Sequence, residues 1–134
     1  MVRSWTVFVS LIQLEMLGLA SYAEHVAGSL PYGSQRRLEI ARALMLAPKL
    51  LLLDEPAAGM NSSEARELER QIRVLRDELG VTIALVEHNM SVVMSVCERI
   101  HVVDHGETIA EGVPAEVREH PRVLAAYLGQ EVDE

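Results

Sequence analysis

Leu50-Leu51-Leu52-Leu53-Asp54-Glu55-Pro56 is the stretch of sequence that decides the fold class of this chain. Four consecutive leucines that end at two acids and a proline indicate a short strand buried on both faces, as in a parallel sheet. Two carboxylates at the end of such a strand are costly unless a bound group uses them. Ligands of open parallel sheets bind outside the carboxyl ends of the strands, so this stretch predicts a site as well as a strand.

A helix is expected after this strand. Asn61 can cap its start, and Glu64 three residues later completes a capping box. Glu69 is expected on the outer face, and Gly80 is a natural helix stop. The apolar positions recur at gaps of four, three and four residues, which places them on one face: Leu68, Ile72, Leu75 and Leu79.

Strands and helices then alternate to the end of the chain. The expected elements are a strand over 81–86, a short helix over 90–97, a strand over 100–103, a hairpin turn over 104–107 that leads into 108–110, and short closing helices that begin at Pro114 and Pro121. Upstream, Ser34 is expected to cap a helix that runs to about Leu46, and residues from about Leu14 to Val26 are expected to form another helix. The predicted architecture is α/β, with parallel strands, flanking helices and a terminal hairpin.

Composition and charge exclude several classes of protein. Apolar residues make up 49% of the 134 residues and charged residues 24%, which is globular and not disordered. The formal charge is −8, and the arginines are scattered among acids, which disfavours nucleic-acid binding. The single cysteine, Cys97, excludes an intrachain disulfide. The apolar run from Trp5 to Ile12 is too short to span a bilayer, and no other candidate span is apparent.

Three side chains could carry phosphoryl chemistry. Asp54 is placed to hold Mg²⁺, because magnesium prefers hard oxygen ligands, and Glu55 is placed to activate a water. His88 follows the strand over 81–86, so parallel strands would bring all three residues to one crevice, where the imidazole could contact a γ-phosphate. The alternatives are an acid pair in a loop or helix cap, a surface histidine, and a Glu87 that serves as polar partner of a neighbour.

Residues 30–35 form a turn that leads into a helix start, where backbone N–H groups bind phosphate readily. Together with the residues above, this segment resembles the ABC ATPase family. The signature segment is matched by residues 30–44, Walker B by 50–56, the D-loop by Ala58, Gly59, Met60 and Asn61, and the H-loop by 86–90. The likeness covers about 14–129, and it divides the chain into an unassigned segment 1–13, the end of a helical subdomain over 14–49, and the ATPase core over 50–134.

The tail over 111–129 and the tyrosine of the signature are similar to the ATP-binding subunits of branched-chain amino acid importers. The resemblance implies ATP and Mg²⁺ as cofactors, with Asp54 at the metal, Glu55 as catalytic base and His88 at the γ-phosphate. It also implies that a signature segment reaches across a dimer to the ATP of the opposite subunit. The signature residues here are Leu30, Pro31, Tyr32, Gly33, Ser34 and Gln35.

The same resemblance implies partners and a location. The expected partners are a second ABC ATPase subunit, membrane permease subunits and, indirectly, a periplasmic or surface binding protein. The expected location is the cytoplasm, peripheral on the inner face of the plasma membrane.

The sequence departs from the family pattern at several positions. Pro31 stands in place of the signature serine, Ser34 in place of a glutamine, and Asn61 in place of the D-loop aspartate. The phosphate-binding loop needs glycine directly before a lysine and Ser/Thr directly after it, but Lys49 is the only lysine and lies between Pro48 and Leu50. The adenine-stacking strands and the Q-loop are also missing.

Two functions remain open. The chain is either a partial subunit of an importer ATPase, or a truncated, non-catalytic remnant that pairs with an intact ABC subunit. In both cases the four leucines need cover on both faces. Some of their apolar area is expected to remain exposed in the isolated chain.

Overall fold

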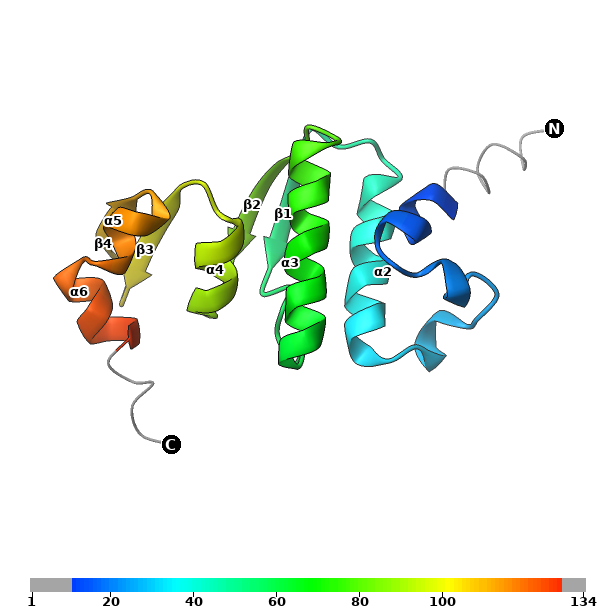
Figure 1. The fold of residues 1–134 in the computed structure, drawn as a ribbon, viewed down its shortest axis with the longest axis horizontal. Coiled ribbons are helices and arrows are strands. Elements are labelled where there is room, and N and C mark those ends of the chain that lie inside the picture. Colours follow the sequence, from blue (N-terminus) through cyan, green and yellow to red (C-terminus); the bar gives the residue numbers. More distant parts are fainter. Residues whose placement is uncertain (1–10, 129–134) are drawn as a thin grey trace. The chain divides into compact units, whose positions relative to one another are not determined.

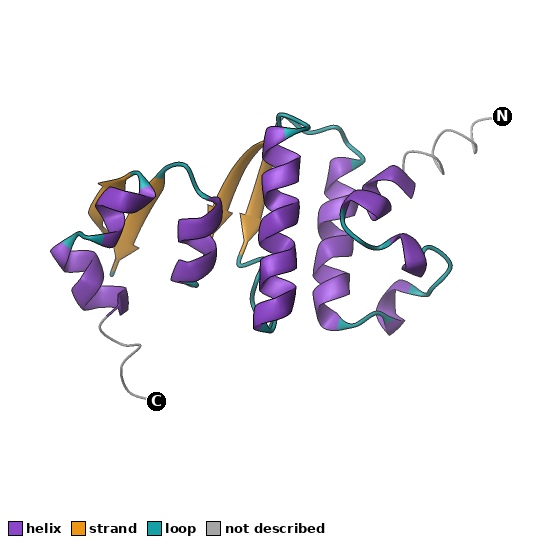
Figure 2. Cartoon of the chain, in the orientation of Figure 1, coloured by secondary structure: helices purple, strands orange, loops and turns teal. Residues whose placement is uncertain are grey.

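The computed structural model describes residues 11–128, which fall into two compact units that meet between Glu87 and His88. Each unit contributes one two-stranded sheet with helices around it (Figure 1; Figure 2). The apolar run that begins at Trp5 lies mostly outside the described residues.

The first unit is built around two parallel strands. After a helical turn over residues 11–16, its elements are η1 (Ala20–Tyr22), η2 (Ala27–Ser29), α2 (Tyr32–Leu44), β1 (Leu50–Asp54), α3 (Ser62–Asp77) and β2 (Thr82–Val86). β1 and β2 pair in parallel from Leu50↔Thr82 to Asp54↔Val86, which confirms the predicted parallel strands. Buried and exposed residues alternate along β1, because successive side chains of a strand point to opposite faces of the sheet.

Helix α3 lies over the sheet of this unit in Figure 1. Its start is the predicted capping box: Asn61 Oδ1 accepts from the N–H groups of Ser63 and Glu64 at 2.9 and 3.0 Å, and Glu64 Oε2 accepts from Asn61 N at 3.0 Å. The predicted apolar positions Leu68, Ile72 and Leu75 are buried.

The other face of the two-stranded sheet has little cover. Leu50 and Leu52 of β1 keep 53% and 71% of their surface exposed, and Val86 of β2 keeps 64%. The expected uncovered apolar face is therefore present, and it is formed by the leucines that alternate with the buried Leu51 and Leu53.

Four local expectations in the first unit are wrong. Residues 14–26 do not form one helix, because Gly18 turns the chain with φ +65° after the helical residues 11–16. Ser34 does not cap α2, which begins at Tyr32 with Pro31 as its N-cap. Leu79 is exposed because α3 ends at Asp77, and Glu69 is buried instead of facing outward.

The second unit is a hairpin with short helices. Its elements are α4 (Met90–Val96), β3 (Ile100–Asp104), β4 (Glu107–Gly112), α5 (Pro114–Arg118), α6 (Pro121–Val123) and η3 (Leu124–Leu128). The turn between the antiparallel strands is the predicted one. His105 and Gly106 both have positive φ, 48° and 83°, as a primed two-residue turn requires. Pro114 and Pro121 start their helices as expected.

The core of the second unit lies between the hairpin and the short helices. It is formed by Val93, Ile100, Val102, Ile109, Ala110, Val117 and Val123, and Cys97 packs against it. The Tyr127 hydroxyl donates to Val103 O at 2.7 Å, which ties η3 to the edge of β3. Within the described residues, no helix is long and apolar enough to cross a membrane.

Candidate functional site

The two predicted carboxylates stand at the carboxyl end of the parallel strands. Asp54 is the last residue of β1 and pairs with Val86, the last residue of β2. The N–H of Glu55 donates to Val86 O at 2.8 Å, so the strand pairing extends to the second acid. Both acids are exposed, and hard oxygen atoms are thus presented where ligands of parallel sheets bind.

Glu55 has an unusual backbone conformation. Its φ is +44°, in the left-handed region that costs an L-residue about 1–2 kcal/mol. The turn that follows holds this geometry, since Ala58 N donates to Glu55 O at 3.1 Å and Met60 N to Ala57 O at 3.1 Å. Strained residues cluster at functional sites, so the conformation of Glu55 agrees with the role predicted for it.

Glu87 fixes the same turn from the neighbouring strand. Its Oε1 accepts from Ala57 N at 2.8 Å, across the loop that follows the two acids. Sequence reasoning predicts Glu87 only as a polar partner of some neighbour, and the signal for this contact is an acid directly after a strand. Glu87 therefore holds the loop that directly follows Asp54 and Glu55.

The predicted signature residues surround the start of α2, and they are unequally exposed. Leu30 is part of the core, Gly33 and Ser34 are buried, and Pro31 and Tyr32 are exposed. The Ser34 hydroxyl accepts from Arg37 Nη2 at 3.0 Å. The N-cap residue of α2, Pro31, provides no side-chain acceptor for the first N–H groups of this 13-residue helix.

Two of the predicted motifs contact each other in the same chain. The Tyr32 ring lies so close to Gly59 that a Cβ at Gly59 would be 2.9 Å from Tyr32 Cε1. Reciprocally, a Cβ at Gly33 would be 2.8 Å from Glu64 Oε1, on the side chain that caps α3. Tyr32 of the predicted signature segment thus packs on Gly59 of the predicted D-loop, and Gly33 packs on the side chain that caps α3.

Arg36 holds the Tyr32 ring from the same helix. Its Nε donates to the Tyr32 hydroxyl at 3.0 Å, and its guanidinium carbon lies 5.3 Å from the ring centroid. The pKa of Arg36 is raised by its hydrogen bond to Glu39 and then by that to Tyr32, so the guanidinium stays charged. The only sequence signal for this arrangement is the spacing of four residues between the two side chains.

The Tyr32–Gly59 contact predicts a measurable loss of stability. Gly59→Ala places a Cβ both at φ +73° and against the ring, and we expect a cost of about 2–4 kcal/mol in the free energy of unfolding. Gly80→Ala is the matched control, because Gly80 has φ +64° but no atom within 4 Å of a Cβ, and it should cost about 1–2 kcal/mol. Urea unfolding measures both, and adding Tyr32→Leu should relieve only the Gly59 variant. Equal losses in the two variants would contradict the contact.

His88 lies two residues beyond the end of β2 and is the first residue of the second unit. Its side chain is exposed. That it shares a crevice with Asp54 and Glu55 stays a prediction. Among residues 11–128 there is no group of three or more His, Cys, Asp or Glu side chains that could hold a metal.

Two family models match different parts of this chain. The family model described as ABC transporter matches residues 10–58, and the one described as Branched-chain amino acid ATP-binding cassette transporter matches residues 107–133. The chain is 49% identical over 117 residues to the high-affinity branched-chain amino acid transport ATP-binding protein LivG of Salmonella typhimurium, covering 87% of this chain and 46% of the relative. BraF of Pseudomonas aeruginosa, of the same description, is 48% identical over the same shares.

The fold of the chain is similar to that of solved ATP-binding cassettes. An ATP-binding cassette of an ABC transporter in its ADP conformation is similar with a TM-score of 0.83 at 30% identity, over 95% of this chain and 51% of that one. A nucleotide-free cassette is similar with a TM-score of 0.76 at 28% identity, over 95% and 47%. The chain therefore spans about half the length of the relatives it matches.

Proposed function

This chain belongs to the family of ABC transporter ATP-binding proteins, and we propose on that basis that it acts as one part of an ATP-hydrolysing importer subunit. The transported substrate class is branched-chain amino acids, by likeness to LivG and BraF. The observation that carries the proposal is the position of Asp54 and Glu55 at the joined carboxyl ends of β1 and β2.

The residues of this chain fit part of a nucleotide site. Asp54 would hold Mg²⁺, which supplies charge neutralisation at the phosphates when bound, and Glu55 would take a proton from the attacking water. The start of α2, with Tyr32 and Gly33, would face the ATP of an opposite subunit. His88 would contact the γ-phosphate.

Residues 1–134 do not include a cradle for the triphosphate. Lys49, their only lysine, stands between Pro48 and Leu50 directly before β1 and cannot form the loop. ATP hydrolysis would thus require a segment that carries the loop, in addition to residues 1–134. The further partners are a second ATPase subunit and permease subunits at the inner face of the plasma membrane, with a binding protein acting through them.

A second candidate is a non-catalytic module that pairs with an intact ABC subunit, and the missing lysine loop favours it. A search of the DNA upstream of Met1 for the loop, in frame or out of frame, separates the two cheaply.

Assembly is the direct test of the partial-subunit proposal. The tagged chain, co-expressed with the part of LivG that the match leaves uncovered, is expected to purify as a one-to-one complex. Capture of full-length LivG in preference to that part would support the pairing module instead.

A further inference from the structure

Two hydrogen bonds from the end of β2 hold the turn that follows β1. At the start of the turn, the N–H of Glu55 donates to Val86 O at 2.8 Å. Two residues later, the N–H of Ala57 donates to Glu87 Oε1 at 2.8 Å. The turn is closed by Ala58 N, which donates to Glu55 O at 3.1 Å. The main chain of Glu55 is therefore held both before and after its Cα atom.

The backbone conformation of Glu55 decides the direction of its carboxylate. Its φ is +44°, which an L-residue adopts only at a cost. Because its N–H is held by Val86 O, a change of φ rotates Cβ and the following carbonyl together about the N–Cα bond. Relaxation to a common φ of about −63° would turn Cβ by about 100°. The same rotation would displace residues 56–58, which Glu87 holds from the neighbouring strand.

Ala57 is a firm point of attachment for this turn. It keeps only 7% of its surface exposed, so its N–H cannot exchange the Glu87 oxygen for bulk water without loss. Carboxylate oxygens also form stronger hydrogen bonds with N–H groups than neutral oxygens do. Pro56 stands between Ala57 and Glu55, and its ring fixes its own φ. One torsion fewer can therefore absorb a movement of Ala57 before that movement reaches Glu55.

We propose that Glu87 is a positioning residue for Glu55: through Ala57 and Pro56 it keeps Glu55 at positive φ and so fixes the direction of the Glu55 carboxylate. The role requires the reach of the Glu87 side chain and its acceptor oxygen, and it does not require its charge. The proposal rests on the proposed function in taking Glu55 as the catalytic base. The conformational link itself concerns only residues 55–58 and Glu87.

Nuclear magnetic resonance of the full chain tests the conformational link. A residue with positive φ gives a strong NOE between its own Hα and N–H, and a buried, hydrogen-bonded N–H exchanges slowly with solvent. Glu87→Ala should weaken this NOE of Glu55 and speed exchange of the Ala57 N–H by about tenfold. Glu87→Gln keeps the acceptor in reach and should preserve both signals. Glu87→Asp keeps the charge but withdraws the oxygen beyond the roughly 2.7–3.2 Å of such a bond, and should behave like Glu87→Ala.

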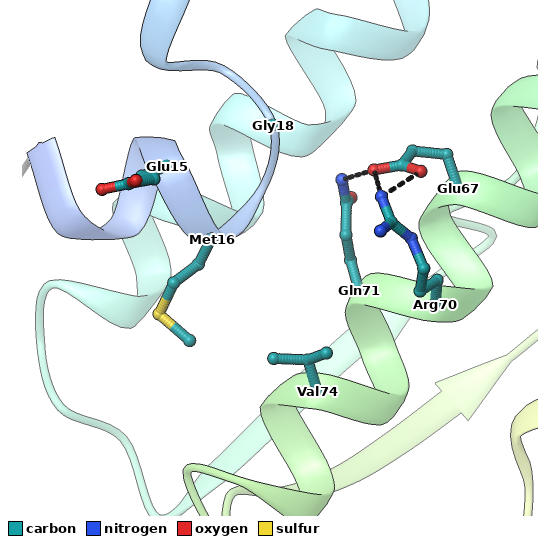
Figure 3. Close-up of a pocket in the computed structure, with 7 residues that line it drawn as sticks. All are labelled: Glu15, Met16, Gly18, Glu67, Arg70, Gln71 and Val74. Carbon is teal, nitrogen blue, oxygen red and sulfur yellow. Dashed lines mark hydrogen bonds and ion pairs between the residues drawn. The ribbon is translucent and has the colours of Figure 1, made fainter.

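Glu67→Ala is the matched control. Like Glu87, Glu67 is a half-buried acid of the first unit whose carboxylate accepts hydrogen bonds, in this case from Arg70 and Gln71. These three residues line a groove between residues 15–18 and α3, away from the turn after β1 (Figure 3). The control should leave the Glu55 NOE and the exchange of the Ala57 N–H unchanged.

Steady-state phosphate release by the complex with the loop-bearing part of a LivG-type subunit tests the consequence for the reaction. Glu87→Ala and Glu87→Asp should lower kcat by about 10–100-fold with an unchanged KM for ATP, because the base is displaced while the phosphates are held elsewhere. Glu87→Gln should stay within about threefold of wild type. Added to Glu55→Gln, Glu87→Ala should cause no further loss of kcat, because Glu87 acts through Glu55.

Three outcomes would overturn the proposal. An unchanged Glu55 NOE in Glu87→Ala would show that the turn keeps its conformation without Glu87. Loss of kcat in Glu87→Gln, with both resonance signals intact, would make the Glu87 carboxylate itself part of the chemistry. A further loss of kcat on the Glu55→Gln background would show that Glu87 does not act through Glu55. A wild-type complex without ATP turnover would instead overturn the proposed function, and the resonance data would still decide the link between Glu87 and Glu55.

Discussion

Replacing Leu52 by lysine is expected to abolish both self-association of the isolated chain and its assembly with a segment that carries the phosphate-binding loop. Leu52 is 71% exposed on the uncovered face of β1 and β2, beside Leu50 and Val86. Apolar surface left in water costs about 25 cal/mol per Å², so the wild-type face should find cover in another molecule. A lysine on it can be buried only at the cost of desolvating its charge.

Sedimentation velocity measures the first effect, and co-purification measures the second. Leu46→Lys is the matched control, because Leu46 is 84% exposed in the loop before β1 and lies off the sheet. It should leave both properties unchanged. A wild-type chain that stays monomeric at high concentration and unfolds cooperatively would mean that this face needs no partner.

Substituting Glu55 by glutamine in the assembled ATPase is the second change with a large expected effect. Glutamine keeps the size of the side chain but cannot accept a proton, and loss of a general base typically lowers kcat by about 10²–10⁴-fold. The KM for ATP should change little, because the phosphates are held by other residues. Steady-state phosphate release measures both constants.

Asp77→Asn is the control for this substitution. Asp77 is an exposed acid at the end of α3, hydrogen-bonded to Arg76 and outside the proposed site. It should leave kcat unchanged. If Glu55→Gln retained full kcat, Glu55 would not be the base, and its positive φ would have no link to catalysis.

Sequence patterns are informative where a side chain acts on its own neighbours. Asn61 caps α3 because its side chain reaches N–H groups two and three residues ahead. His105 and Gly106 form the hairpin turn because such turns need positive φ. The four leucines followed by two acids predict the parallel strands, because a continuous apolar run of this length is typical of a strand covered on both faces.

Two of the errors have local causes that the sequence rules rank too low, and the omission of one contact has a non-local cause. The sequence predicts Ser34 as the cap of α2, but the chain enters the helix earlier, at Pro31, and the hydroxyl pairs with Arg37 instead. Gly18 breaks the expected helix over 14–26, and its close approach to α3 is not visible in a periodicity. The contact of Tyr32 with Gly59 joins residues far apart in sequence, which no spacing rule predicts.

ATP turnover by this chain, alone and in complex with the loop-bearing part of a LivG-type subunit, is the measurement that tests the central claim most directly. Alone, the chain should release no phosphate above background, because Lys49 cannot form a cradle for the triphosphate. The complex should hydrolyse ATP in a magnesium-dependent reaction that Glu55→Gln removes. Turnover by the chain alone, or a stable complex that never hydrolyses ATP, would contradict the claim that this chain carries the catalytic half of an ABC ATPase.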